Sequence, residues 1–103
     1  MNVTLLYFED CPNWKGADQR LSEIASERPD VVVTHHRVET VEEAERLGFH
    51  GSPSILLDGV DVFAEPGASV GLSCRIYRTA DGPSGAPTME MLRVALGLSN
   101  EEA

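Results

Sequence analysis

Residues 3–14, VTLLYFEDCPNW, set the arrangement of the rest of the chain. Their first part, residues 3–8, is a nearly continuous apolar run rich in strand formers, which is typical of a central strand covered on both faces. Pro12 lacks an N–H group and prefers a helical φ, which suits the first position of a helix. We therefore predict a strand over residues 3–8, a helix that begins near Pro12, and Cys11 as the residue that caps this helix.

The next segments predict a helix, a strand and a second helix. Apolar residues recur with helical spacing from Trp14 onward. Residues 31–38 are rich in β-branched side chains and predict the second strand. Thr40, followed three residues later by Glu43, matches a capping box and predicts a short helix that begins at Val41.

The third and fourth strands are predicted to form a hairpin. Asp58 and Gly59 separate two short apolar segments, residues 54–57 and 60–63. Asp-Gly is favoured in two-residue hairpin turns because both residues tolerate positive φ. We expect these segments to pair.

Residues 64–87 are rich in Gly, Pro and Ser and predict a long ordered loop. Three apolar residues in it alternate with polar neighbours and predict one short strand with its apolar side inward: Leu72, Cys74 and Ile76. A last helix is expected to begin near Met89, capped by Thr88, and residues 99–103 are expected to fray.

This order of elements predicts a single α/β domain over residues 1–103, with a mixed four-stranded sheet and helices packed on it. A chain of 103 residues suits one domain with one modest core. The formal net charge of −9 repels phosphate backbones and anionic lipids. We therefore expect neither nucleic acid nor a membrane as a partner.

The cellular location is expected to be the cytoplasm. No apolar run approaches the ~20 residues that a membrane span needs. The segment from Met1 to Thr4 leads directly into the first strand without the features of a secretory signal. Two cysteines are too few for a disulfide framework, so in a reducing compartment they indicate catalysis, metal binding or burial.

Two short motifs resemble the active-site landmarks of the thioredoxin superfamily: the Cys-Pro step at residue 11 and GSPS at residues 51–54. The chain is most similar to small thioredoxin-like proteins with a Tyr-Phe-x-x-Cys-Pro motif, some of whose relatives are selenoproteins or are labelled organomercurial lyase-like. YFEDCP at residues 7–12 and GLSCR at residues 71–75 carry this resemblance.

The resemblance implies a thioredoxin-like fold in which the Ser52–Pro53 bond is cis and lies beside Cys11. It also implies that the backbone of Ser52 faces an extended substrate, with a groove for a protein partner beside Pro53. The chain departs from the family's Cys-x-x-Cys pattern, because Trp14 stands where the second cysteine would be. The spacing of Trp14 favours a place in the core, with substrate contact as the alternative.

Cys11 is the predicted nucleophile. At a helix N-terminus, backbone N–H groups and the helix dipole lower the pKa of a thiol, which favours the reactive thiolate. The alternative is that Cys11 is an inert, buried residue, as free cysteines often are. Cys74 is either its remote resolving thiol, because the loop is long enough to reach Cys11, or a plain core residue.

The function predicted first is a thiol-dependent oxidoreductase without a cofactor, in which Cys11 attacks a disulfide, a peroxide or an activated sulfur. Cys74 or an external low-molecular-weight thiol would resolve the product, and the expected substrate contacts are Pro12, Trp14, Ser52 and Pro53. The alternatives are a non-catalytic interaction module and a thiolate site for mercury or another soft metal.

No zinc-type site is expected, because no Cys/His pair has the spacing of structural zinc sites. His35 and His36 are neighbours in a predicted strand and so point to opposite faces. His50 lies apart from both in the sequence.

Overall fold

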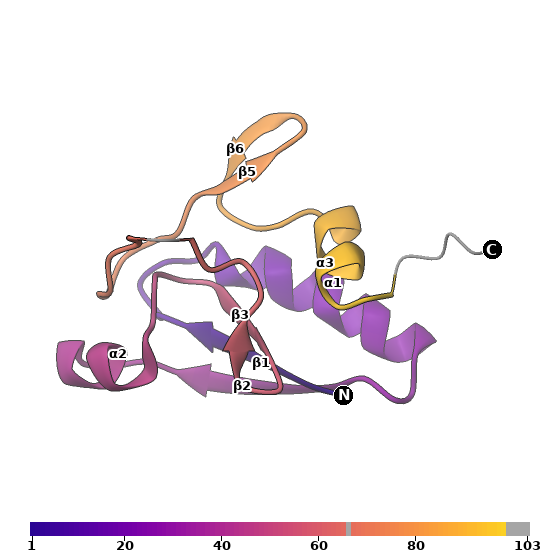
Figure 1. Cartoon of the computed structure of the whole chain (residues 1–103), viewed down its shortest axis with the longest axis horizontal. Helices are drawn as coiled ribbons and strands as arrows, with labels where there is room; N and C mark the ends of the chain where they lie inside the picture. The colour runs from indigo at the N-terminus through magenta and orange to yellow at the C-terminus, as the bar shows by residue number, and fades with distance from the viewer. Residues whose placement is uncertain (66, 99–103) are drawn as a thin grey trace.

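The computed structural model describes residues 1–65 and 67–98 and shows an α/β fold (Figure 1). The expectation that residues 99–103 fray lies outside the described residues. In chain order the elements are β1 (Asn2–Tyr7), α1 (Trp14–Glu27), β2 (Val32–Arg37), α2 (Val41–Leu47), β3 (Ser54–Leu57), β4 (Val60–Asp61), β5 (Tyr77–Thr79), β6 (Gly82–Ser84) and α3 (Met89–Ala95).

The predicted mixed four-stranded sheet is confirmed. Its strand order is β2-β1-β3-β4. β1 pairs in parallel with β2 and antiparallel with β3, and β3 pairs antiparallel with β4. β1 is therefore an inner strand, as its apolar run predicts, and its C-terminal end carries the chain toward Cys11.

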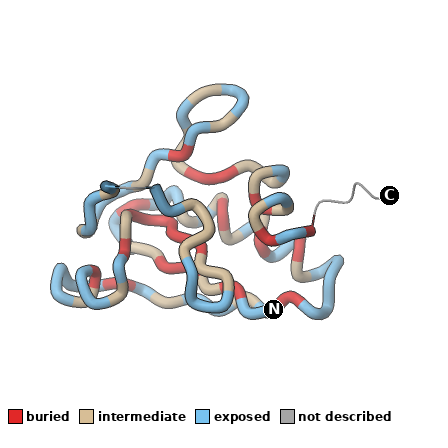
Figure 2. Tube along the Cα trace, in the orientation of Figure 1, coloured by how far each residue is buried: buried red, intermediate tan, exposed pale blue. Residues whose placement is uncertain are grey.

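Helices cover both faces of the sheet, and the alternation of side chains along β1 explains how. Val3 and Leu5 point into the larger core cluster, with Leu21 of α1 and Leu92 of α3. Leu6 points to the other face and joins a smaller cluster with α2. Figure 1 shows α1 and α3 together on one side of the sheet, and Figure 2 shows that buried residues line the centre of the molecule.

The local turn and cap predictions are confirmed. Asp58 and Gly59 have φ of 50° and 89°, so both central residues of the β3–β4 turn are left-handed. The Thr40 hydroxyl accepts a hydrogen bond from the Glu43 N–H at 3.0 Å, and Thr88 caps α3 in the same way. Of the helices in the described residues, none is long and apolar enough to cross a membrane.

The predicted cap of the first helix is wrong. α1 begins at Trp14, and Asn13 rather than Cys11 is its N-cap. The Cys11 N–H donates to the Phe8 carbonyl at 3.0 Å, and the Lys15 N–H donates to the Pro12 carbonyl at 3.1 Å. These two hydrogen bonds close consecutive turns, so the chain leaves β1 through a turn before helical bonding begins.

The predicted strand around Leu72, Cys74 and Ile76 is also wrong. Cys74 forms only an isolated bridge with Ser52, and Ile76 is 65% exposed. The inward-facing residue is Tyr77, at the start of a second, two-stranded sheet made of β5 and β6. The expected loop over residues 64–87 thus contains a hairpin, which projects from the body of the molecule (Figure 1).

β4 is shorter than the predicted strand over residues 60–63. It ends at Asp61. The Asp61 carboxylate accepts a hydrogen bond from the Phe63 N–H at 2.9 Å. This side-chain contact forms part of the turn that follows β4, as Asp does in turns.

Candidate redox site

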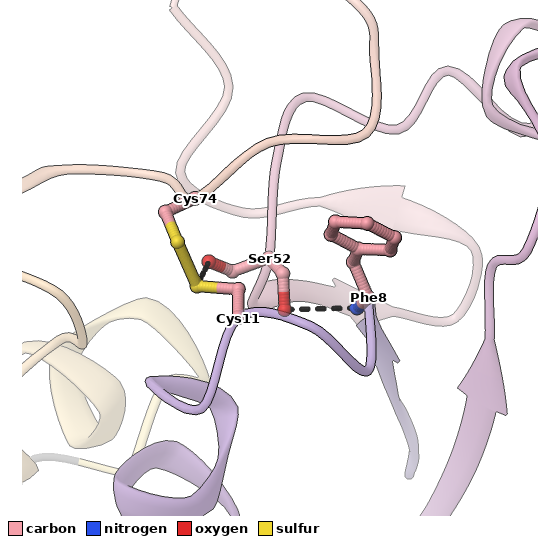
Figure 3. Close-up of a disulfide and its surroundings, with 4 residues drawn as sticks. All are labelled: Phe8, Cys11, Ser52 and Cys74. Atoms are coloured by element: carbon pink, nitrogen blue, oxygen red, sulfur yellow. Dashed lines mark hydrogen bonds between the residues drawn. A yellow bond between two sulfur atoms is a disulfide. The ribbon is translucent and has the colours of Figure 1, made fainter.

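A disulfide joins Cys11 to Cys74, 63 residues further along the chain (Figure 3). Their Cα atoms lie 5.7 Å apart, within the usual range for a disulfide. Cys11 follows the C-terminal end of β1, and Cys74 lies in the segment before β5. Cys74 is therefore the sulfur partner of Cys11.

The Ser52–Pro53 peptide bond is cis, as the resemblance implies. The Ser52 carbonyl oxygen lies 3.7 Å from the Cys11 Sγ, so a reduced Cys11 thiol can donate a hydrogen bond to it. The Ser52 hydroxyl accepts a hydrogen bond from the Phe8 N–H at 2.9 Å (Figure 3). These contacts fix the end of β1 against the chain that precedes β3.

The backbone of Ser52 is paired with the chain itself. The Ser52 N–H donates to the Ser73 carbonyl at 2.8 Å, and the Arg75 N–H donates to the Ser52 carbonyl at 2.9 Å. We call residues 73–75 the Cys74 segment. It occupies the edge of Ser52 at which the resemblance places an extended substrate, and both Ser52 and Pro53 are fully buried.

Gly51 permits this close approach. Its φ is 114°, and a Cβ atom added there would lie 3.0 Å from the Cβ of Arg75 and 3.2 Å from its Cα. A larger residue would be strained in this conformation and would push the Cys74 segment away. The glycine at this position therefore brings Cys74 within reach of Cys11.

Arg75 anchors the Cys74 segment on its other side. Its guanidinium donates hydrogen bonds to the Asp61 carboxylate at 2.9 Å, the Phe63 carbonyl at 2.6 Å and the Ser54 hydroxyl at 3.2 Å. The Arg75 and Asp61 side chains are only 10% and 11% exposed. The ion pair is thus largely shielded from water, and it ties the segment to the ends of β3 and β4.

Tyr77 adds a further contact to this anchor. Its hydroxyl donates a hydrogen bond to the Pro53 carbonyl, and the Arg75 guanidinium carbon lies 5.0 Å from the centre of its ring. Burial raises the pKa of the Tyr77 phenol, and the charge of Arg75 opposes this only in part. Tyr77 therefore acts as a neutral hydrogen-bond donor that holds the cis-proline loop.

Trp14 and Pro12 differ in how far they face solvent. The Trp14 ring is half-buried, packs against the larger core cluster and stacks on Tyr7 with 4.4 Å between ring centres. Its Nε1 atom is buried and has no hydrogen-bond partner among the described residues. Pro12 is exposed, in the turn next to Cys11. Trp14 thus supports the core from the first turn of α1, and Pro12 lies at the surface.

The three histidines lie apart. His35 contacts Asp18 of α1 at 2.6 Å, and His36 contacts Glu43 of α2 at 2.9 Å. Because α1 and α2 cover opposite faces of the sheet, the predicted divergence of these two side chains is confirmed. Within residues 1–65 and 67–98, no three His, Cys, Asp or Glu residues gather into a cluster that could hold a metal ion.

The two cysteines of the disulfide differ in exposure. Cys11 is 1% exposed, whereas Cys74 is an exposed residue. Thiol–disulfide exchange requires direct access to the sulfur that is attacked. The disulfide therefore joins a buried cysteine to an exposed one.

Sequence reasoning missed the residues that hold the Cys74 segment. Asp61 is a polar residue in a predicted strand, and Arg75 is noted only as part of the GLSCR motif. The only local signals of these contacts are Gly51, directly before the Ser52-Pro53 step, and Arg75, directly after Cys74. Neither indicates its partner, because both contacts join segments far apart in the sequence.

Comparison of the chain with protein-family models, curated proteins and solved structures finds no match to any of them.

Proposed function

We propose that the chain is a thioredoxin-like thiol–disulfide oxidoreductase whose redox pair is Cys11 and Cys74. The observation that carries the proposal is the disulfide between a buried and an exposed cysteine beside a cis-proline. The dithiol form would pass two electrons to an external disulfide or peroxide, and two molecules of a low-molecular-weight thiol would return two electrons to the disulfide form. No cofactor is needed for this chemistry, because the sulfurs themselves carry the electrons.

Three features support the thioredoxin-like part of the proposal. The redox cysteine follows β1, which pairs in parallel with β2 and antiparallel with β3. The Ser52–Pro53 bond precedes β3, is cis and lies against this cysteine. The second thiol comes from a distant segment, which compensates for the missing Cys-x-x-Cys pattern.

The proposal is tested by redox titration of the whole chain. The protein is equilibrated in mixtures of reduced and oxidised dithiothreitol, trapped with an alkylating agent and weighed by mass spectrometry. We expect a reversible transition in which two thiols appear together while circular dichroism remains native. The reduced protein should then re-form its disulfide with oxidised glutathione or with hydrogen peroxide. The double variant Cys11→Ser/Cys74→Ser is the control and should show no transition.

Two results would count against the proposal. Reduction that unfolds the chain would make the disulfide a structural crosslink. A native chain whose disulfide neither reduces nor re-forms would favour the non-catalytic interaction module, although the backbone of Ser52 is already paired with the Cys74 segment.

A second candidate function is the binding of a soft metal ion by the reduced pair. The only two cysteines of the chain place their sulfurs side by side, and thiolates prefer soft ions such as Cu(I). Anaerobic titration of the reduced protein with Hg(II) tests this function. One ion per chain, with loss of tight binding in both Cys11→Ser and Cys74→Ser, would support it, whereas binding in excess of one ion or unchanged binding in the variants would contradict it.

A further inference from the structure

We infer that Cys74 is the sulfur that exchanges with external thiols and disulfides, and that Cys11 is the resolving sulfur. This inference rests on the proposed function and assigns the two roles within it. It reverses the sequence-based expectation that Cys11 is the nucleophile. The reversal follows from how the fold presents each sulfur.

Access separates the two sulfurs. A thiolate that attacks a disulfide must reach one sulfur from the side opposite the bond that breaks. Cys11 is 1% exposed and lies between the end of β1 and the Ser52 carbonyl, so no external group can reach it (Figure 3). Cys74 is exposed and approaches Cys11 from the surface. An external thiol therefore meets Cys74 first.

The position of α1 removes the argument for a nucleophilic Cys11. The helix begins at Trp14, with Asn13 as its N-cap. The Cys11 sulfur lies 3.7 Å from the Ser52 carbonyl oxygen. A carbonyl accepts a hydrogen bond from a thiol but repels a thiolate, and burial also favours the neutral form. Cys11 is therefore suited to remain a thiol until a mixed disulfide forms beside it.

The Cys74 segment keeps the two sulfurs close after reduction. Its backbone pairs with Ser52 on both sides of Cys74, and Arg75 is held by Asp61 and Phe63. None of these contacts involves a sulfur atom. A mixed disulfide on Cys74 would thus lie next to the Cys11 thiol, and its resolution would be intramolecular and fast.

The exchange with an external disulfide takes two steps. With the reduced protein, the Cys74 thiolate attacks an external disulfide RSSR, forms Cys74–S–S–R and releases RS⁻, which takes up a proton. The Cys11 sulfur then attacks Cys74 Sγ, forms the Cys11–Cys74 bond and breaks the bond to the second RS group, which takes up the Cys11 proton and leaves as RSH. One external disulfide is reduced to two thiols, and the protein dithiol is oxidised to the disulfide. The reverse sequence begins with attack of RS⁻ on Cys74.

Pulse alkylation of the reduced chain tests the assignment without any substitution. The native protein receives a short pulse of iodoacetamide and is then denatured and digested with trypsin. Cys11 and Cys74 fall on different tryptic peptides, because Lys15 and several arginines lie between them. We expect Cys74 to be labelled at least about tenfold faster than Cys11 in the native state, and both at similar rates in denaturant.

Single variants provide a second measurement. In Cys11→Ser, the remaining Cys74 should form a stable mixed disulfide with oxidised glutathione, whereas Cys74→Ser should react at least about tenfold more slowly. Native circular dichroism confirms that each variant is folded, and reaction in denaturant provides the intrinsic rate. If a variant unfolds, labelling of Cys74 at least about tenfold faster than Cys11 in the native wild-type chain still supports the assignment.

The outcomes also separate this inference from the proposed function. Faster labelling of Cys11, or equal labelling of both cysteines, in a protein that still cycles would overturn the assignment and leave the oxidoreductase standing. Failure of the wild-type disulfide to reduce and re-form would overturn the oxidoreductase and the assignment together.

Discussion

Arg75 is the residue on which the position of Cys74 depends most directly. Its guanidinium faces the Asp61 carboxylate, and both side chains are about a tenth exposed. Removal of one partner from a largely buried ion pair leaves the other charge uncompensated. We predict that Arg75→Met lowers the free energy of unfolding by about 3 kcal/mol, measured by urea denaturation of the oxidised chain.

The same variant tests the positioning role of Arg75. A looser Cys74 segment lowers the effective concentration of the two thiols, so Arg75→Met should favour the reduced form by about tenfold, or roughly 30 mV. Arg78→Met is the matched control, because Arg78 is exposed and lies in β5, three residues after Arg75. An unchanged dithiothreitol equilibrium in Arg75→Met would contradict the positioning role, whatever its effect on stability.

At the scale of elements, α2 is tied to β2 through a single carboxylate. Glu43 accepts a hydrogen bond from the Glu39 N–H at 3.0 Å, and its other oxygen lies 2.9 Å from the His36 ring. The hydrogen bond to His36 is the largest cause that lowers the pKa of Glu43 from its ordinary 4.5. Because the folded-state pKa is depressed, this contact stabilises the fold above pH 4.5 and is lost as the pH falls through the folded value.

We therefore predict that Glu43→Gln lowers the urea midpoint near neutral pH, and that the difference between the variant and wild-type midpoints shrinks as the pH falls below 4.5. Urea titrations at several pH values between 3 and 7 measure this. Glu45→Gln is the control on the same helix, because the exposed Glu45 carboxylate makes no hydrogen bond or ion pair with a described residue. A midpoint difference that stays constant down to pH 3 would show that Glu43 does not act through its charge.

At the scale of the whole molecule, the disulfide joins the sheet to the segment that follows residue 64. It closes a loop with a sequence separation of 63 residues. In the chain-entropy description, a crosslink across such a loop stabilises the folded state by about 4 kcal/mol. We predict that reduction lowers the free energy of unfolding by up to about this amount while the sheet, α1 and α3 remain folded.

Urea denaturation with and without dithiothreitol, followed by circular dichroism, measures the effect of the disulfide. The double variant Cys11→Ala/Cys74→Ala should unfold at the same urea concentration in both conditions. Loss of the native spectrum on reduction alone would mean that the main core cluster cannot hold the fold by itself.

The sequence by itself determined the elements whose signals are local. The apolar run of β1, the Asp58-Gly59 turn and the threonine caps of α2 and α3 each depend on residues within a few positions of one another. Local backbone preferences and side-chain periodicity act over such distances, so these elements and their order along the chain were predictable. The cis peptide bond before Pro53 was also expected, but from family resemblance rather than from the dipeptide.

Only the tertiary structure decided how the two cysteines are used. The sequence allowed Cys74 to reach Cys11 but also allowed it to be a core residue, because loop length limits reach and not direction. The choice depends on contacts across long separations: Gly51 against Arg75, Arg75 with Asp61, and the Cys74 segment with Ser52. Such contacts form when the packed sheet brings distant segments together, and the same packing buries Cys11 and leaves Cys74 exposed.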